Sequence, residues 1–290
     1  GLKVHTTINS RLQQFAEESM RTHISALQKD FYTHWKGYTK APYPDDFEWE
    51  QINAIIDQGM KRSERYRKLK KAGKSKKDIE TIFKKKVPMT LFSWKGEVDT
   101  IMSPRDSIKY NKFFIHSGMM SMDPKTGYVK AYVGGINHKH FQYDHVTSGK
   151  RQVGSTFKPF LYSLAIQEGY SPCYKVPNVP VVFDKYKWRL EKDWKPKNSG
   201  GEELDGLLLT LKFGLANSIN TVTAYIMKQF GPYAVVDLAK KIGIESEILP
   251  VPSLCLGTFD LSVYEMVGAY STFVNKGVWT EPIFITKIED

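Results

Sequence analysis

Ser155 and Lys158 stand three residues apart, and this pair is the strongest chemical signal in the sequence. Residues three apart on a helix lie on the same face, so the amine can reach the hydroxyl without help from another segment. A serine hydroxyl becomes a nucleophile when a neighbouring base takes its proton. Pro159 is tolerated only in the first turn of a helix, which predicts a helix start near Ser155. The free backbone N–H groups of such a start can hold a developing oxyanion.

The residues around this pair, and a second polar group downstream, match a known pattern. Residues 151–160 read Arg-Gln-Val-Gly-Ser-Thr-Phe-Lys-Pro-Phe, and residues 215–220 read Leu-Ala-Asn-Ser-Ile-Asn. These segments resemble the Ser-x-x-Lys and Ser-x-Asn motifs of penicillin-binding transpeptidases of the bifunctional class A type. Residues 264–277 are also similar to this family. The resemblance implies an α+β fold related to the serine β-lactamases, with helices packed on an antiparallel sheet.

The resemblance also implies a peptidoglycan D,D-transpeptidase, which crosslinks stem peptides through a serine acyl-enzyme and is inhibited by β-lactams. Ser155 is then the nucleophile, and its backbone N–H supplies half of the oxyanion hole. Lys158 is the expected base, but only when neutral, because a lysine with the ordinary pKa of about 10.4 is almost wholly charged at neutral pH. Lowering this pKa by about three units costs roughly 4 kcal/mol. Partial burial beside Phe157 and Leu161 can produce such a shift.

The geometry expected of these residues is specific. Ser155 and Lys158 should lie on the first turn of one buried helix, with their side chains within hydrogen-bond reach. Ser218 and Asn220 should lie between two helices and project toward Ser155. Ser218 can then relay a proton to the leaving nitrogen, and Asn220 can hold Lys158 and the substrate amide.

Three further residues, Trp194, Asn198 and Thr156, are candidates for substrate binding. Residues 194–198, Trp-Lys-Pro-Lys-Asn, resemble the segment beside the cleft in this family. The alternative is that these residues shape a loop and do not contact the substrate. Thr156 is a candidate as part of the nucleophile motif. The seven histidines show no ligand pattern, so neither a metal nor a cofactor is expected.

The third motif of the family, Lys-Thr-Gly, has no counterpart after the nucleophile. Lys125-Thr126-Gly127 spells it, but these residues precede Ser155 and fit a hairpin turn that begins at Asp123. Together with the start on Gly1, this predicts an excised fragment whose C-terminal strands are missing. Such a fragment is expected to be inactive or to acylate slowly, because one oxyanion donor is worth about 10² to 10³ in rate.

Two other functions stay open beside the transpeptidase. A β-lactamase-type hydrolase needs a carboxylate base for a deacylating water, and Glu191, Glu202 and Glu203 are candidates by position only. The other alternative is a non-catalytic scaffold that binds the cell wall. Stable, transient or absent labelling by a penicillin distinguishes the three.

The charge of the chain is concentrated in one stretch. Residues 61–86 contain thirteen basic and three acidic residues, a net charge of +10 out of the +11 of the whole sequence. Such a block is typical of a solvated helical hairpin, or of a surface attracted to an anionic membrane or cell-wall polymer. No nucleic-acid fold motif accompanies it, so nucleic acid is not an expected partner.

Composition limits the remaining possibilities. Two cysteines, Cys173 and Cys255, are too few for a disulfide framework; two buried thiols are expected, with a single bridge as the alternative in an oxidising compartment. No apolar run reaches the roughly 20 residues of a membrane span. By resemblance, the fragment is soluble and comes from a protein that is anchored to the membrane and acts on its periplasmic, extracytoplasmic face.

The expected organisation has two parts. Residues 1–102 form a linker or pedestal with a helical basic insertion at about 48–86, and residues 103–290 form the truncated transpeptidase domain. Strands are expected at 2–8, 89–94, 119–122, 128–133 and 279–288. Helices are expected from residue 10, at 49–60, within the basic block on both sides of Gly73, at 103–118, 155–168, 210–217, 220–230, 232–242, and at 262–275 with a Ser262–Glu265 capping box.

Overall fold

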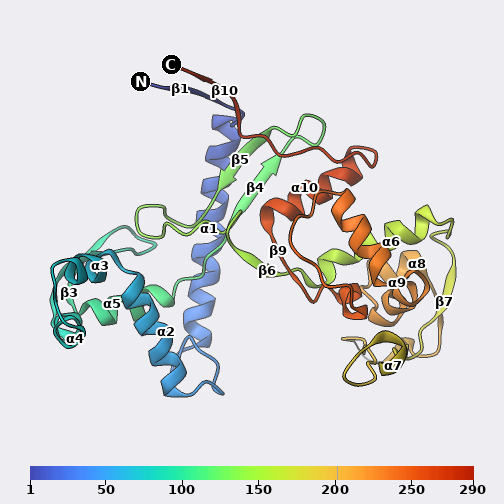
Figure 1. Cartoon of the computed structure of the whole chain (residues 1–290), viewed down its shortest axis with the longest axis horizontal. Helices are drawn as coiled ribbons and strands as arrows, with labels where there is room; N and C mark the ends of the chain where they lie inside the picture. Colours follow the sequence, from blue (N-terminus) through green and yellow to red (C-terminus); the bar gives the residue numbers. More distant parts are fainter. Residues whose placement is uncertain (201) are drawn as a thin grey trace. The chain divides into compact units, whose positions relative to one another are not determined.

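Residues 1–200 and 202–290 are described by the computed structural model (Figure 1). The chain divides into two units with separate interiors. The first unit contains residues 1–14, 118–134 and 143–290, and the second contains residues 15–117 and 135–142. Both candidate motifs lie in the first unit, and the basic stretch lies in the second.

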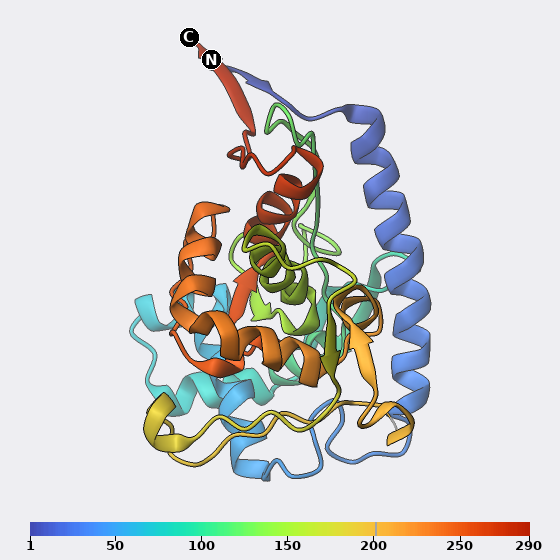
Figure 2. The same cartoon turned by 90° about the vertical axis from the view of Figure 1, so that its right-hand side faces the viewer.

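The described strands of the first unit form four antiparallel pairs. β1 (Lys3–Thr6) pairs with β10 (Ile285–Glu289), so the two termini lie side by side (Figures 1 and 2). The other pairs are β4 (Met119–Met122) with β5 (Val129–Val133), β6 (Lys150–Gln152) with β9 (Asp260–Ser262), and β7 (Lys175–Pro177) with β8 (Leu208–Thr210). The strand expected at 279–288 begins only at Ile285, after Pro282, which lacks the N–H that a strand ladder needs.

The turn between β4 and β5 has the predicted chemistry. The Asp123 carboxylate accepts hydrogen bonds from the backbone N–H groups of Lys125 and Thr126, at 2.9 and 3.1 Å. Gly127 has a φ of 74° and donates its N–H to the Asp123 carbonyl at 2.9 Å. Lys125-Thr126-Gly127 is therefore a turn, as predicted.

The helices of the first unit enclose its main core. A 3₁₀ turn, η1 (Gly154–Phe157), leads into α6 (Lys158–Gln167), which packs against α9 (Asn220–Lys241) and η3 (Pro252–Leu256). The helices expected at 220–230 and 232–242 are both present and share the label α9; they are separated by a kink at Gly231, whose φ of 77° and ψ of 162° are not helical. The remaining elements are α7 (Lys185–Trp188), η2 (Glu202–Leu204), α8 (Leu211–Ala216) and α10 (Val263–Val274), which begins with the predicted Ser262–Glu265 capping box.

The second unit is mostly helical. It contains most of α1 (Ser10–His34), then α2 (Trp49–Arg62), α3 (Glu64–Lys71), α4 (Lys76–Lys84) and α5 (Pro104–Lys112), with the hairpin of β2 (Val87–Leu91) and β3 (Val98–Met102). As predicted, Ser103 caps α5 and the basic stretch breaks at Gly73 and restarts at Ser75.

α5 ends at Lys112, so the prediction that it continues to Gly118 is wrong. The buried side-chain amide of Gln28 forms hydrogen bonds with backbone groups just beyond the helix, which a longer helix would use within itself. It donates to the Phe113 carbonyl and accepts from the Ile115 N–H, both at 2.8 Å. Sequence periodicity could not reveal this contact, because Gln28 is 85 residues away from Phe113.

Candidate active site

The nucleophile candidate Ser155 lies in the 3₁₀ turn η1 and is exposed. The α-helix itself begins three residues later at Lys158, whose backbone N–H donates to the Ser155 carbonyl. Residues i and i+3 eclipse each other in a 3₁₀ turn, so the three-residue spacing still directs the two side chains to one side. The expected first turn of a buried helix is therefore a 3₁₀ turn that exposes the serine and buries the lysine.

Two glycines hold this turn in place. Gly154 and Gly257 both have positive φ angles, 55° and 65°, and the Gly154 N–H donates to the Gly257 carbonyl at 3.0 Å. A Cβ atom on Gly257 would lie 2.1 Å from the Gly154 carbonyl oxygen. The backbone before Ser155 therefore packs directly on η3, a contact that only glycine permits.

Lys158 is the central residue of the site. Its side chain is 1% exposed, and its amine donates three hydrogen bonds. The acceptors are the Ser218 carbonyl at 2.7 Å, the Ser218 hydroxyl at 2.9 Å and the Asn220 amide oxygen at 2.6 Å. The amine thus joins the two motifs that lie 60 residues apart in the sequence.

Burial lowers the pKa of the Lys158 amine from 10.5 to about 8. Phe157 and Leu161, the apolar neighbours expected from the sequence, are 1% and 0% exposed. With this pKa, roughly one amine in ten is neutral at pH 7.

Ser155 has no hydrogen bond to Lys158 in the described part of the chain, so the prediction that the two side chains are within hydrogen-bond reach is not met. The amine is bound instead by Ser218 and Asn220. The backbone N–H of Ser155 likewise makes no hydrogen bond with any described residue. An exposed hydroxyl next to a free N–H suits a carbonyl substrate that approaches both.

Ser218 and Asn220 lie at the junction of α8 and α9, between two helices as predicted. Ser218 has a φ of 54°, which is uncommon for a residue other than glycine and directs both of its oxygens to Lys158. Such strained backbone is frequent at functional sites. Asn220 is held from two sides, because its amide nitrogen donates to the Lys197 carbonyl at 2.8 Å.

Asn198 connects the loop before it to the start of α9. The N-cap residue of α9 is Ile219, whose side chain cannot accept a hydrogen bond. The amide oxygen of Asn198 takes over this task and accepts from the Thr221 N–H at 3.1 Å. Its nitrogen donates to buried Asn178 at 2.9 Å. This loop therefore orients the helix that presents Asn220.

Trp194 and Thr156, two of the three residues considered for substrate binding, make contacts with other residues of the protein. Trp194 pairs with Phe183 through both backbone groups, and the two rings lie 5.2 Å apart. The Thr156 hydroxyl donates to the Val153 carbonyl, and the Thr156 carbonyl accepts from the Tyr270 hydroxyl. Substrate binding by Trp194, Asn198 and Thr156 stays a prediction.

Sequence reasoning missed two residues that support the site, Gly257 and Tyr270, and identified Cys255 only as a buried thiol, which is confirmed. Cys255 is fully buried near Lys158, and burial raises the pKa of its thiol to about 12. Cys173 is exposed, so the expectation of two buried thiols is wrong for this residue. Both cysteines are free.

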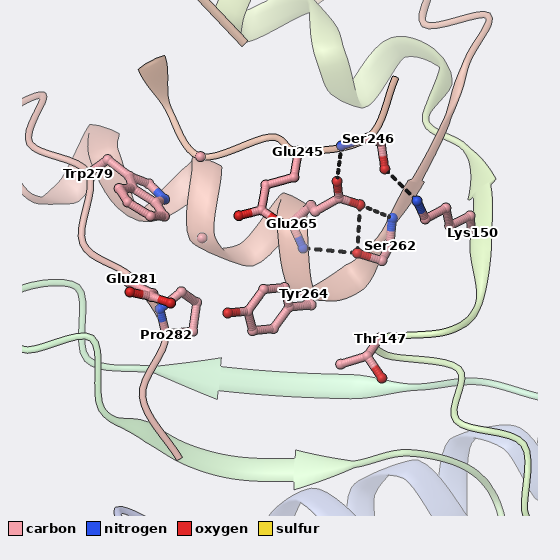
Figure 3. A pocket seen from close by; sticks show the side chains of 12 residues that line it. Thr147, Lys150, Glu245, Ser246, Ser262, Tyr264, Glu265, Trp279, Glu281 and Pro282 are labelled. Carbon is pink, nitrogen blue, oxygen red and sulfur yellow. Dashed lines mark hydrogen bonds between the residues drawn. The ribbon is translucent and has the colours of Figure 1, made fainter. Parts of the chain in front are cut away.

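A pocket of about 330 Å³ lies elsewhere in the first unit (Figure 3). Trp279, Tyr264, Glu245 and Glu281 are among its lining residues, and Ser155 and Lys158 are not. The Glu265 carboxylate at its edge is fully engaged by the N–H groups of Ser246 and Ser262 and by the Ser262 hydroxyl, as Figure 3 shows.

Two of the three acids considered for a hydrolase lie on the surface. Glu191 and Glu203 are exposed, and the side chain of Glu202 lies outside the described residues. Within residues 1–200 and 202–290 there is no group of three or more acids, histidines or cysteines that could hold a metal ion. None of the described helices is both long and apolar enough to cross a membrane.

Comparison with protein families identifies the class. The penicillin binding protein transpeptidase domain matches residues 118–290, and the penicillin-binding protein middle domain matches residues 38–115. The transpeptidase match alone covers more than half of the chain, so the chain belongs to the family of penicillin-binding protein transpeptidase domains. The family resemblance expected from the two motifs is confirmed.

Individual relatives agree with this assignment. The chain is 26% identical over its whole length to penicillin-binding protein 1A of Rickettsia conorii, and covers 38% of that protein. It is 35% identical over 60% of its length to penicillin-binding protein 1A of Pseudomonas aeruginosa, and covers 21% of that protein. The chain therefore spans about two fifths or less of the length of these relatives.

Solved structures show the same fold. Penicillin-binding protein 1A from Haemophilus influenzae matches all of this chain with a TM-score of 0.65 at 21% identity, over 45% of its own chain. PonA1 from Mycobacterium tuberculosis matches 81% of this chain with a TM-score of 0.51 at 25% identity, over 60% of its own chain. The α+β fold class expected from the sequence is confirmed.

Proposed function

We propose that this chain forms a serine acyl-enzyme with the D-alanyl-D-alanine end of peptidoglycan stem peptides, as a D,D-transpeptidase, and that β-lactams acylate the same serine. The observation behind the proposal is the buried Lys158 amine, which is bound by Ser218 and Asn220 and stands one 3₁₀ turn after the exposed Ser155. The solved complex of PonA1 with penicillin V supports β-lactams as ligands of a protein with this fold.

In the first step, the Ser155 hydroxyl oxygen attacks the carbonyl carbon of the penultimate D-alanine. Its proton passes to the neutral Lys158 amine, whose pKa of about 8 makes the neutral form accessible. The Ser155 N–H donates to the oxyanion of the tetrahedral intermediate. The missing hydrogen bond between Ser155 and Lys158 has to form when substrate binds, which is common for catalytic contacts in unliganded sites.

Collapse of the intermediate breaks the peptide bond and leaves an ester on Ser155. The departing D-alanine nitrogen takes a proton from the Lys158 ammonium, and the Ser218 hydroxyl relays it because it already accepts from that ammonium at 2.9 Å. The amine of a second stem peptide then attacks the ester, its proton passes back through the same groups, and free Ser155 is restored.

Labelling with a fluorescent penicillin tests the proposal on the natural protein that contains residues 1–290. We expect a covalent label on the wild type and on Ser148→Ala, which removes an exposed hydroxyl outside the site. Ser155→Ala should carry no label. Equal labelling of Ser155→Ala and the wild type would contradict the role of Ser155, and so would a wild type that does not label at all.

Persistence of the label separates the reaction classes. A transpeptidase acylated by penicillin should keep its label for hours, because no carboxylate among the described side chains is hydrogen-bonded to Lys158 to activate a deacylating water. Loss of the label within minutes would indicate a β-lactamase instead. Release of D-alanine from a synthetic stem peptide, dependent on an added amine acceptor, would support transpeptidation directly. We expect this reaction on the extracytoplasmic face of the membrane, where the peptidoglycan substrate lies.

A further inference from the structure

The strongest charge concentration of the protein lies in the second unit, on residues 61–86, here called the basic segment. Its thirteen basic residues are all exposed: Lys61, Arg62, Arg65, Arg67, Lys68, Lys70, Lys71, Lys74, Lys76, Lys77, Lys84, Lys85 and Lys86. The candidate active site and the proposed reaction make no use of them. The basic segment therefore calls for a separate explanation.

The helices of the basic segment turn their apolar side chains inward. Ile79 and Phe83 of α4 are each 1% exposed and form a small core with Met60 at the end of α2. Tyr66 and Leu69 of α3 pack on the same core, while α3 itself has no fully buried residue. Both helices therefore present mainly charge to solvent, and none of their large apolar side chains is fully exposed.

The acids of the basic segment do not neutralise it. Glu64 pairs with Lys68 at 2.7 Å, and Glu80 lies 3.9 Å from Lys76, each within one helix. Asp78 is occupied in the capping box of α4 with Ser75. Within the described part of the chain, the other eleven basic side chains have no ion-pair partner. The surface thus has a large unbalanced positive charge.

We propose that the basic segment is an electrostatic docking surface for an anionic lipid membrane, bound at the level of the headgroups. Ten of its thirteen basic residues are lysines, which act as point charges and not as bidentate anion binders. The two pockets identified among the described residues are lined by residues outside the basic segment, so neither gives these charges a fixed recognition geometry. Fluid lipids can move laterally to match such a pattern, whereas a ligand of fixed geometry gains less from it.

Vesicle sedimentation of the 290-residue chain itself tests this proposal. We expect binding to vesicles of phosphatidylcholine with about 30% phosphatidylglycerol, and none to pure phosphatidylcholine. Binding should be strong at low salt and absent at about 1 M NaCl, where the Debye length falls to about 3 Å. Binding that persists at 1 M NaCl would indicate apolar insertion and overturn the proposal.

Two matched variants locate the surface. Replacing Lys70, Lys71, Lys74 and Lys77 by Gln should weaken vesicle binding by about fivefold per lysine, which is about 600-fold for the four together. The control variant replaces four exposed lysines of the first unit by Gln, and so changes the net charge by the same amount: Lys212, Lys228, Lys240 and Lys241. It should bind as the wild type does. Equal weakening by both variants would show that only total charge matters and would refute the assignment to the basic segment.

A soluble polyanion separates lipid from other anionic partners. Polyphosphate at the same phosphate concentration should compete weakly, because the bilayer presents its charge as a dense surface. If polyphosphate displaces the protein from vesicles completely at that concentration, the surface is a polyanion site and the lipid proposal fails. Circular dichroism melts of both variants show whether the folded state is kept.

Discussion

At the scale of single residues, the chemistry depends on Lys158. Its amine combines two features, near-complete burial and three hydrogen-bond acceptors. The first lowers its pKa, and the second orients the amine. Ser155, by contrast, needs exposure so that a substrate can reach it. A buried base one turn behind an exposed nucleophile is therefore a better arrangement than the buried pair expected from the spacing.

The pKa of Lys158 predicts the pH dependence of acylation. Because the neutral amine is the base, the second-order rate of penicillin acylation should rise about tenfold per pH unit from pH 6 to 7 and level off above about pH 8. Stopped-flow or gel-based labelling across pH 6–9.5 measures this profile.

Lys158→Arg provides the control for this profile. The guanidinium keeps the positive charge but cannot lose its proton in this range, so the rate should fall by at least about 10² and lose its rise with pH. A wild-type rate that is flat between pH 6 and 8 would exclude Lys158 as the base.

At the scale of elements, the site depends on contacts between segments that are distant in the sequence. α6 presents Lys158, the junction of α8 and α9 presents Ser218 and Asn220, and η3 holds the turn that contains Ser155. The loop at 194–198 caps α9 through Asn198 and thereby orients Asn220. Each element is short or exposed on one side, so its position comes from its neighbours.

The contact between η3 and the nucleophile turn makes Gly257→Ala a sharp test. The new Cβ would lie 2.1 Å from the Gly154 carbonyl oxygen, so the turn must shift. We expect a loss of penicillin acylation of at least about 10², since a displacement of about 1 Å at a reacting group has this effect. Thermal unfolding should also occur at a lower temperature.

The matched control for this substitution is Gly169→Ala. Gly169 also has a positive φ, 89°, but a Cβ there meets nothing within 4 Å. Gly169→Ala should therefore lower the free energy of unfolding by about 1–2 kcal/mol through backbone strain alone and leave the acylation rate unchanged. Similar acylation rates for the two variants would show that the contact between Gly257 and Gly154 does not position Ser155.

At the scale of the whole molecule, the buried amine connects function to stability. The pKa of Lys158 is lowered to about 8 in the folded chain and is near 10.5 in the unfolded chain. Between these two values the unfolded chain binds a proton that the folded chain does not, so this residue makes stability rise with pH. Below about pH 8 its destabilising effect is constant, at about 3 kcal/mol.

Chemical denaturation at pH 7 and pH 10 tests this linkage. The free energy of unfolding of the wild type, measured relative to Lys158→Met, should increase by about 2–3 kcal/mol between these pH values. Taking the difference between the two proteins cancels the titration of other lysines and tyrosines. A difference that stays constant with pH would mean that Lys158 has its ordinary pKa in the folded state.

Local sequence determined much of what is observed. The Ser103 and Ser262 caps, the break at Gly73, and the turn at Asp123 all appear where their residue types predict them, since each depends on hydrogen bonds within three or four residues. The spacing of Ser155 and Lys158 places both residues on one turn for the same reason. The family and the fold class followed from these local patterns.

Tertiary structure decided the environment of these groups. Burial of Lys158, its bonds to Ser218 and Asn220, and the packing of Gly257 on Gly154 join segments that are 60 to about 100 residues apart. The early end of α5 has the same origin, because Gln28 reaches it from α1. A pKa depends on the three-dimensional surroundings of a group, and so does the accessibility of a nucleophile. Residue types and spacing identify the candidate site residues, whereas packing between distant segments determines their protonation, orientation and exposure.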